Sequence, residues 1–187
     1  TQVSVVLPAY NEAENLVELI PETTAALRGA GLTYELVVVD DGSTDGTADL
    51  LREMQARDVV TISLRRNAGK SAALDAGLAR VQGEYVVLMD ADGQDDPTQI
   101  PRLLAALDAD DDLDLVTGRR AVRHDRFVKR TTSKLYNRTT ALVTGVNGRD
   151  FNSGFKAMRR ELATTLGLYG ELHRYIPVLA QWRGFKV

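Results

Sequence analysis

Almost wholly apolar runs alternate with longer amphipathic segments from the N-terminus to about residue 117. The apolar runs are predicted strands: Val3–Leu7, Glu35–Val39, Val59–Leu64, Tyr85–Met89 and Leu113–Thr117. The segments between them are predicted helices: Ala13–Ala30, Thr47–Ala56, Lys70–Val81 and Thr98–Leu107. Strands without a polar face are typical of sheets covered on both sides. The alternation therefore predicts an α/β fold with a mostly parallel central sheet, right-handed crossovers and flanking helices.

Polar motifs follow three of these predicted strands directly. They are Pro8–Glu12 after the first strand, Asp40–Ser43 after the second and Asp90–Asp92 after the fourth. In open α/β sheets, ligands bind beyond the carboxyl ends of the strands. We therefore expect the three acidic loops to lie together on one edge of the sheet and to form a binding site.

The Asp90-Ala91-Asp92 motif carries two carboxylates one residue apart, with the amide oxygen of Gln94 close behind. Mg²⁺ and Mn²⁺ accept a few carboxylates and complete their coordination with phosphate oxygens and water. The motif thus predicts a cation site that could hold a diphosphate. The alternative is a solvated acidic turn, in which Pro97 starts the next helix.

The segment Asp40–Gly46 also has two interpretations. It can be a glycine turn in which Ser43, Thr44 or Asp45 caps the following helix. An Asp at the strand end can equally accept hydrogen bonds from a base or a ribose, and the two roles are compatible. A phosphoacceptor receiver domain also carries acidic residues at a strand end, but it is shorter and lacks a second acidic pair.

Composition narrows the possible functions. The chain has 187 residues, 44% hydrophobic and 26% charged, which fits one globular domain. A net charge of −3 argues against general nucleic-acid binding, and the absence of Cys excludes disulfides and thiolate metal sites. No apolar run approaches a membrane span and no signal peptide is visible. Gly184–Val187 resembles the start of a strand, so we expect truncation at the C-terminus.

A strongly basic segment occupies Arg119–Arg138, with eight Lys or Arg residues against one Asp. A helix is predicted from about Phe127 to Thr144. Its basic residues recur at three- or four-residue spacing and form a cationic stripe: Lys129, Arg130, Lys134 and Arg138. The stripe suits an anionic acceptor phosphate or the surface of an anionic membrane, and the alternative is an ordinary solvated helix face.

Three motifs in this order resemble the family 2 glycosyltransferases, which have the GT-A fold. They are Val5–Glu12, Val39–Gly46 and the metal motif Asp90–Pro97. The resemblance covers essentially the whole chain and implies a single GT-A domain over residues 1–187. Within it, residues 1–118 would form the nucleotide-binding part and residues 119–187 the acceptor side.

Motifs in the second half resemble the polyprenyl-phosphate branch of this family, which includes dolichol-phosphate mannose synthases. They are Gly118-Arg119, Lys129–Ser133, Asp150–Lys156 and Glu171–Arg174. Polysaccharide synthases of the family carry Gln-x-x-Arg-Trp, whereas Gln181-Trp182-Arg183 has these residues in another order. The resemblance implies work at the cytoplasmic face of a membrane, with Mg²⁺ or Mn²⁺ and a GDP- or UDP-sugar.

The resemblance also implies a role for individual residues. The nucleoside would contact Pro8, Ala9, Tyr10, Glu12, Val39 and Asp41. The metal would be bound by Asp90, Asp92 and Gln94, with Ala91 between them. Arg119, Lys129 or Arg130, and Ser133 would meet the donor or acceptor phosphates, and Asp92, Arg119, Arg130 and Ser133 are the predicted catalytic residues. His173 and Arg174 are site residues or structural ones, and Asp150 orients the basic segment or contacts the acceptor.

The resulting hypothesis is inverting transfer of a sugar to a polyprenyl phosphate, undecaprenyl or dolichyl. Such an acceptor is already anionic, so no strong general base is required, which fits a chain with two His. Two alternatives remain open. The acceptor could be a saccharide hydroxyl, which would need a carboxylate base, or the chain could bind the donor without turnover.

Overall fold

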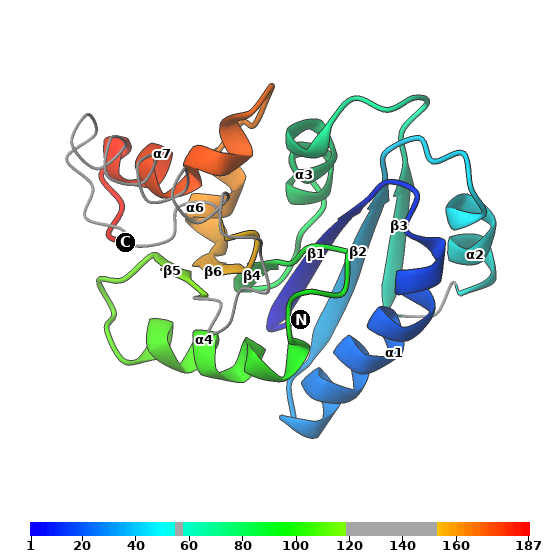
Figure 1. Ribbon diagram of the computed structural model, residues 1–187. Coiled ribbons are helices and arrows are strands. Elements are labelled where there is room, and N and C mark those ends of the chain that lie inside the picture. Colours follow the sequence, from blue (N-terminus) through cyan, green and yellow to red (C-terminus); the bar gives the residue numbers. More distant parts are fainter. Residues whose placement is uncertain (55–57, 119–152) are drawn as a thin grey trace, which may run out of the picture.

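The computed structural model describes residues 1–54, 58–118 and 153–187. Its centre is a six-stranded sheet in the order β3-β2-β1-β4-β6-β5 (Figure 1). The strands are β1 (Val3–Ala9), β2 (Tyr34–Asp40), β3 (Val59–Ser63), β4 (Tyr85–Leu88), β5 (Leu115–Thr117) and β6 (Lys156–Arg159). All five predicted strands are present, and β6 is an addition that the apolar pattern did not predict.

The first four strands are parallel, with Val3 of β1 opposite both Tyr34 of β2 and Tyr85 of β4. β6 runs antiparallel to its two neighbours, β4 and β5. The prediction of a mostly parallel sheet flanked by helices is confirmed. The antiparallel strand is short, and only one of its four residues is partly exposed.

Helices cover both faces of the sheet, as Figure 1 shows. They are α1 (Ala13–Gly29), α2 (Thr47–Glu53), α3 (Lys70–Leu78), α4 (Ile100–Asp108), α6 (Arg160–Thr165) and α7 (Ile176–Trp182), with 3-10 turns η1 (Pro97–Gln99) and η2 (Leu172–Tyr175). Successive side chains of a strand point to opposite faces. Val5 and Leu7 of β1 therefore pack with α1, α2 and α4, while Val6 packs with α3, α6 and α7.

Several element ends differ from the predicted ones. Helix α3 ends at Leu78, before Val81, and η1 precedes α4. Pro97 begins η1, where the carboxylate of Asp96 accepts a hydrogen bond from Thr98 N at 2.9 Å. The Thr98 hydroxyl donates to the same carboxylate and is the main cause of a lowered pKa for Asp96, to which the amide bond adds. The predicted helix at 127–144 lies outside the described residues.

The C-terminal residues return to the edge of the sheet. Lys186 forms a parallel bridge with Leu113, and its amide donates to the Asp114 carboxylate at 2.8 Å. The strand-like character of Gly184–Val187 therefore corresponds to a single bridge. No helix in the described ranges is long and apolar enough to cross a membrane.

Gly77 allows α3 to lie directly on the sheet. A Cβ at this position would stand 2.5 Å from Cγ1 of Val6 and 3.1 Å from Cγ2 of Val39. We expect Gly77→Ala to destabilise the fold by about 1–3 kcal/mol, because the added methyl overpacks this interface. Denaturant unfolding measures the loss. Gly29→Ala is the matched control, since nothing lies within 4 Å of its added Cβ; equal losses in the two variants would contradict this account.

Candidate active site

The strand order reverses between β1 and β4, which are neighbours in the sheet but not in the sequence. In open α/β sheets, ligands bind at such a switch point, in the crevice beyond the carboxyl ends of the strands. A cavity of about 290 Å³ lies there. We call it the switch-point cavity; it is lined by Pro8, Ala9, Tyr10, Glu12, Asp41, Asn67, Gly69, Lys70, Ala73, Asp90, Ala91 and Asp92.

The loops after β1 and β2 are held together by hydrogen bonds through Asn11. Its backbone has a φ of 57°, a left-handed conformation that Asn tolerates better than most residues. Asn11 N donates to Ser43 Oγ at 2.9 Å, and its side-chain oxygen accepts from Thr44 N at 2.8 Å. Glu12 N donates to Thr47 Oγ1 at 3.1 Å. These bonds fix the backbone on one side of the cavity.

The second loop reaches the start of α3 through Asp41, which is almost fully buried. Asp41 Oδ1 accepts from Ala68 N at 2.7 Å, and Oδ2 accepts from Gly69 N at 2.9 Å. Asp40 accepts instead from Ser43 N within its own turn, at 2.9 Å. Asp41 thus stands in the cavity wall while both of its oxygens hold the loop that leads to Lys70.

Asp45 of the second motif binds Thr47, the first residue of α2, while the N-cap of that helix is Gly46 and has no side-chain cap. Its Oδ1 accepts from Thr47 N and from the Thr47 hydroxyl, at 2.9 and 2.6 Å, and Oδ2 accepts from Ala13 N at 3.3 Å. The hydrogen bond from the Thr47 side chain is the main cause of a lowered pKa for Asp45. The predicted cap by Ser43, Thr44 or Asp45 is therefore wrong in detail, because Asp45 bonds the start of α2 from the residue before its N-cap. Asp41 lines the switch-point cavity.

The Asp90 carboxylate forms an ion pair with Lys70, the first residue of α3. Lys70 Nζ lies 2.5 Å from Asp90 Oδ1, with side-chain exposures of 34% and 21%. The backbone of Gly154 packs against the same carboxylate, because a Cβ there would stand 2.4 Å from both of its oxygens. Asp95 Oδ2 also accepts from Asp90 N, at 3.2 Å. Asp90 is therefore held in place by three separate segments.

The three predicted metal ligands are not equivalent in the structure. Asp90 and Asp92 line the switch-point cavity, and Asp92 Oδ1 accepts from Gln94 N at 3.0 Å. Gln94 is exposed and does not line the switch-point cavity. Within the described ranges, no three His, Asp or Glu side chains cluster in a way that could hold a metal ion. Any cation bound here would take only part of its ligands from these residues.

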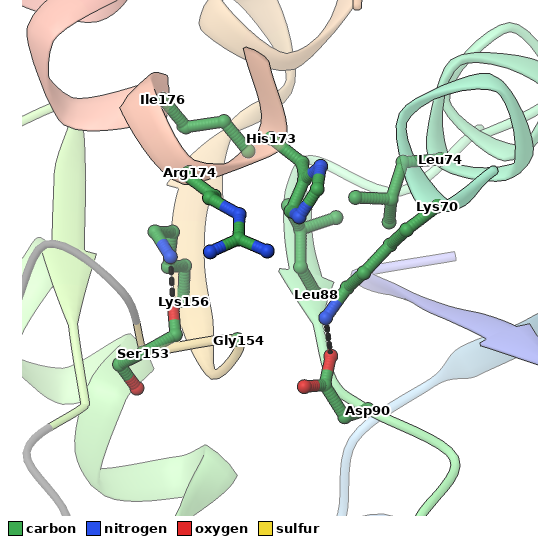
Figure 2. A pocket seen from close by; sticks show the side chains of 10 residues that line it. All are labelled: Lys70, Leu74, Leu88, Asp90, Ser153, Gly154, Lys156, His173, Arg174 and Ile176. Carbon is green, nitrogen blue, oxygen red and sulfur yellow. Dashed lines mark hydrogen bonds and ion pairs between the residues drawn. The ribbon is translucent and has the colours of Figure 1, made fainter. Parts of the chain in front are cut away.

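A second cavity, also of about 290 Å³, shares Lys70 and Asp90 with the first (Figure 2). We call it the basic cavity; it is lined by Lys70, Leu74, Leu88, Asp90, Ser153, Gly154, Lys156, His173, Arg174 and Ile176. Lys156 is buried, and its ammonium donates to the backbone carbonyl of Ser153. Burial and, secondarily, the Lys70 ammonium lower the pKa of His173.

The remaining predicted site residues fall into two groups. The side chain of Val39 is fully buried in the core, so it does not line the switch-point cavity. Five others lie outside the described residues: Arg119, Lys129, Arg130, Ser133 and Asp150.

The sequence analysis did not predict Lys70 as a site residue, although the Asn67-Ala68-Gly69 break marks the start of its helix. His173 and Arg174 both line the basic cavity.

The parallel sheet, the switch-point crevice and the acidic strand ends define the class of protein: this is the GT-A fold of nucleotide-sugar glycosyltransferases. The family model "Glycosyl transferase family 2" matches residues 4–167. The chain belongs to this family.

Solved structures of related enzymes agree with this assignment. Glucosyl-3-phosphoglycerate synthase from Mycobacterium tuberculosis, in complex with Mn²⁺, UDP and glucosyl-3-phosphoglycerate, matches 97% of the chain with 27% identity and a TM-score of 0.74. Mannosyl-3-phosphoglycerate synthase from Rubrobacter xylanophilus matches 86%, with 26% identity and a TM-score of 0.67. A Pyrobaculum calidifontis mannosyltransferase in complex with GDP-mannose and Mn²⁺ matches 90%, with 25% identity and a TM-score of 0.63.

The chain spans only part of the length of these proteins. The matched region covers 66% of the mycobacterial synthase, 54% of the Rubrobacter enzyme and 47% of the Pyrobaculum enzyme.

The role of Asp41 in holding the Asn67–Gly69 loop can be tested by Asp41→Asn. The amide NH₂ would face a backbone N–H, so one buried hydrogen bond is lost. We expect a destabilisation of about 1–3 kcal/mol and faster amide hydrogen exchange at Ala68 and Gly69. Asp49→Asn, on an exposed face of α2, is the control. Unchanged exchange at both amides would show that Asp41 does not hold this loop.

Proposed function

We propose that this chain is the catalytic domain of a metal-dependent inverting glycosyltransferase. It would transfer a sugar from a nucleoside diphosphate sugar to a polyprenyl phosphate. The observation that carries the proposal is that the switch-point cavity and the basic cavity share Lys70 and Asp90. A donor in the first cavity would therefore present its diphosphate at the boundary with the second.

The nucleoside would occupy the switch-point cavity between the ends of β1 and β2. Tyr10, 44% exposed, offers a ring face for stacking on a base, and Pro8, Ala9 and Glu12 line the same wall. Asp41 retains lone pairs for a ribose or base donor, because a carboxylate accepts about four hydrogen bonds. These contacts do not separate uracil from guanine, so both UDP- and GDP-sugars are candidates.

The carboxylates of Asp90 and Asp92 suit a divalent cation that is bound jointly with its substrate. Mg²⁺ typically binds through one or two carboxylates and several phosphate oxygens, rather than in an all-protein cage. The Asp90 carboxylate already pairs with one positive charge, the Lys70 ammonium at 2.5 Å, and a metal ion would be a second. Asp90 and Asp92, with Gln94 as a further predicted ligand, would hold Mg²⁺ or Mn²⁺. The ion would neutralise charge that develops on the leaving diphosphate.

The reaction would be a direct displacement. An oxygen of the acceptor phosphate attacks the anomeric carbon, and the bond from that carbon to the diphosphate oxygen breaks with its electron pair. Nucleoside diphosphate leaves, and the anomeric centre is inverted. No proton is removed from the attacking oxygen, so the described residues need supply no general base. Lys70 would stabilise the diphosphate from the protein side.

Two lines of support favour a phosphate-bearing acceptor. The motifs around Arg119, Lys129–Ser133 and Asp150–Lys156 resemble the polyprenyl-phosphate branch, and the basic stripe predicted from the sequence suits an anionic membrane surface. Under this proposal the protein works at the cytoplasmic face of a membrane. The relatives from Mycobacterium and Rubrobacter are named for phosphoglycerate products, which makes phosphoglycerate the second candidate acceptor.

The metal-site part of the proposal predicts that Asp92→Ala lowers kcat at least about 100-fold, because several kcal/mol of leaving-group stabilisation are lost. The assay measures nucleoside diphosphate release with donor, acceptor and Mn²⁺ present. Asp112→Ala is a suitable control, because its side chain is exposed and lies far along the chain from the cavity. Unchanged turnover in Asp92→Ala would eliminate the metal-site assignment.

The acceptor is tested by a panel of undecaprenyl phosphate, dolichyl phosphate, 3-phosphoglycerate and simple sugars, each with UDP- and GDP-sugars. We expect transfer to a polyprenyl phosphate, since that acceptor needs no base. Transfer only to phosphoglycerate would replace the lipid with the second candidate. Transfer to sugar hydroxyls would contradict the base-free mechanism, and donor binding without any product would favour a binding module.

A further inference from the structure

The basic cavity collects basic side chains from three elements that are distant in sequence. Lys70 comes from α3, Lys156 from β6, and His173 and Arg174 from η2. Asp90 is the single acidic residue in its lining, and Lys70 already pairs with it. The lining thus has an excess of positive charge, which suits an oxyanion rather than a neutral sugar.

The guanidinium of Arg174 extends into this cavity, between Lys156 and His173 (Figure 2). Its Nε donates to Glu171 Oε2 at 2.8 Å, which anchors the side chain at one end. Among the described residues, no group accepts a hydrogen bond from Nη1 or Nη2. These two nitrogens can therefore present a planar, two-pronged donor pair to a phosphate.

The ring of His173 is oriented by Ser71, which is 99% buried on α3. His173 N donates to Ser71 Oγ at 3.1 Å, and Ser71 Oγ lies 2.9 Å from Nδ1 of the same residue. A buried hydroxyl hydrogen needs an acceptor. Nδ1 is the only acceptor recorded for it within the described part of the chain.

It follows that Ser71 donates to Nδ1, and neutral His173 then carries its proton on Nε2. Burial lowers the pKa of His173, which favours the neutral ring near pH 7. Nε2 would then offer an N–H rather than a lone pair. A group of this kind binds an oxyanion and does not coordinate a metal.

We propose that the basic cavity binds the phosphate of the acceptor, with Arg174 Nη1 and Nη2 and His173 Nε2–H as its donors and Ser71 as the residue that positions His173. The oxyanion chemistry follows from the cavity itself, whereas its assignment to the acceptor rests on the proposed function. The basic cavity would hold the attacking phosphate beside the Lys70–Asp90 pair, next to the donor diphosphate.

The test uses inorganic phosphate as the probe and the imidazole ¹⁵N signals of His173 as the readout. The chain has two His, so His124→Gln leaves His173 as the single imidazole. At a pH where the ring is neutral, we expect the Nε2–H tautomer and a saturable shift of its signals on adding phosphate. The Nδ1–H tautomer, or no saturable shift, would overturn the proposal.

Two pairs of variants, made in the His124→Gln background, separate the proposed donors from general charge and from folding. Arg174→Gln should weaken phosphate binding about tenfold, the loss typical of one charged hydrogen-bonding group. Arg102→Gln, on the exposed side of α4, should leave it unchanged. Ser71→Ala should remove the tautomer preference, and Ser71→Thr should keep it. Equal effects of the two Arg variants, or an unchanged tautomer in Ser71→Ala, would contradict the assignment.

A further experiment distinguishes whether the basic cavity binds the phosphate of the acceptor or the diphosphate of the donor. With UDP or GDP and Mg²⁺ at saturation, inorganic phosphate should still shift His173, because the two cavities are filled separately. Loss of that shift would assign the basic cavity to the donor diphosphate and overturn its assignment to the acceptor. Calorimetry on the same samples measures the binding of UDP or GDP. Absence of nucleotide binding would refute the proposed function. It would not affect the binding of phosphate by His173 and Arg174, which is measured separately.

Discussion

The ion pair between Lys70 and Asp90 is the contact on which the rest of the site depends. It joins the first residue of α3 to Asp90, the second residue after β4, and both residues line two cavities of similar volume. An anionic acceptor must approach an anionic leaving group during the proposed transfer, and the two repel each other at close range. A fixed ammonium that lines both cavities, together with a divalent cation on the carboxylates, would lower that repulsion where both anions meet.

The sheet order explains why these groups meet. β1 and β4 are neighbours although four other elements of the chain, β2, α2, β3 and α3, lie between α1 and β4. The loops after β1, β2 and β4 therefore converge. Asp41 then ties the second loop to the start of α3 through Ala68 N and Gly69 N, which sets the direction from which Lys70 approaches. On the other side, Gly154 can approach Asp90 because it has no Cβ.

The sequence was sufficient for the part of the fold that follows simple patterns. Continuous apolar runs predicted the five strands up to Thr117, and the acidic motifs predicted the edge of the sheet at which the switch-point cavity lies. β6 was missed because Lys156–Arg159 contains two basic residues, and its burial comes from tertiary pairing with β4 and β5. Lys70 was missed because a Lys at the start of a helix is usually exposed. Nothing in the local sequence indicates that it pairs with Asp90, 20 residues further along the chain. Gln94 was grouped with Asp90 and Asp92 by spacing alone, whereas the bend after β4 leaves it exposed.

The most direct test of the account is a crystal structure of the protein with a nucleoside diphosphate and Mn²⁺, in which anomalous scattering locates the ion. The account predicts a manganese peak in contact with a carboxylate of Asp90 or Asp92 and with the diphosphate, the base beside Tyr10, and the Lys70 ammonium against phosphate oxygens or still paired with Asp90. A nucleotide bound away from the switch-point cavity, or a manganese ion that contacts neither carboxylate, would contradict it.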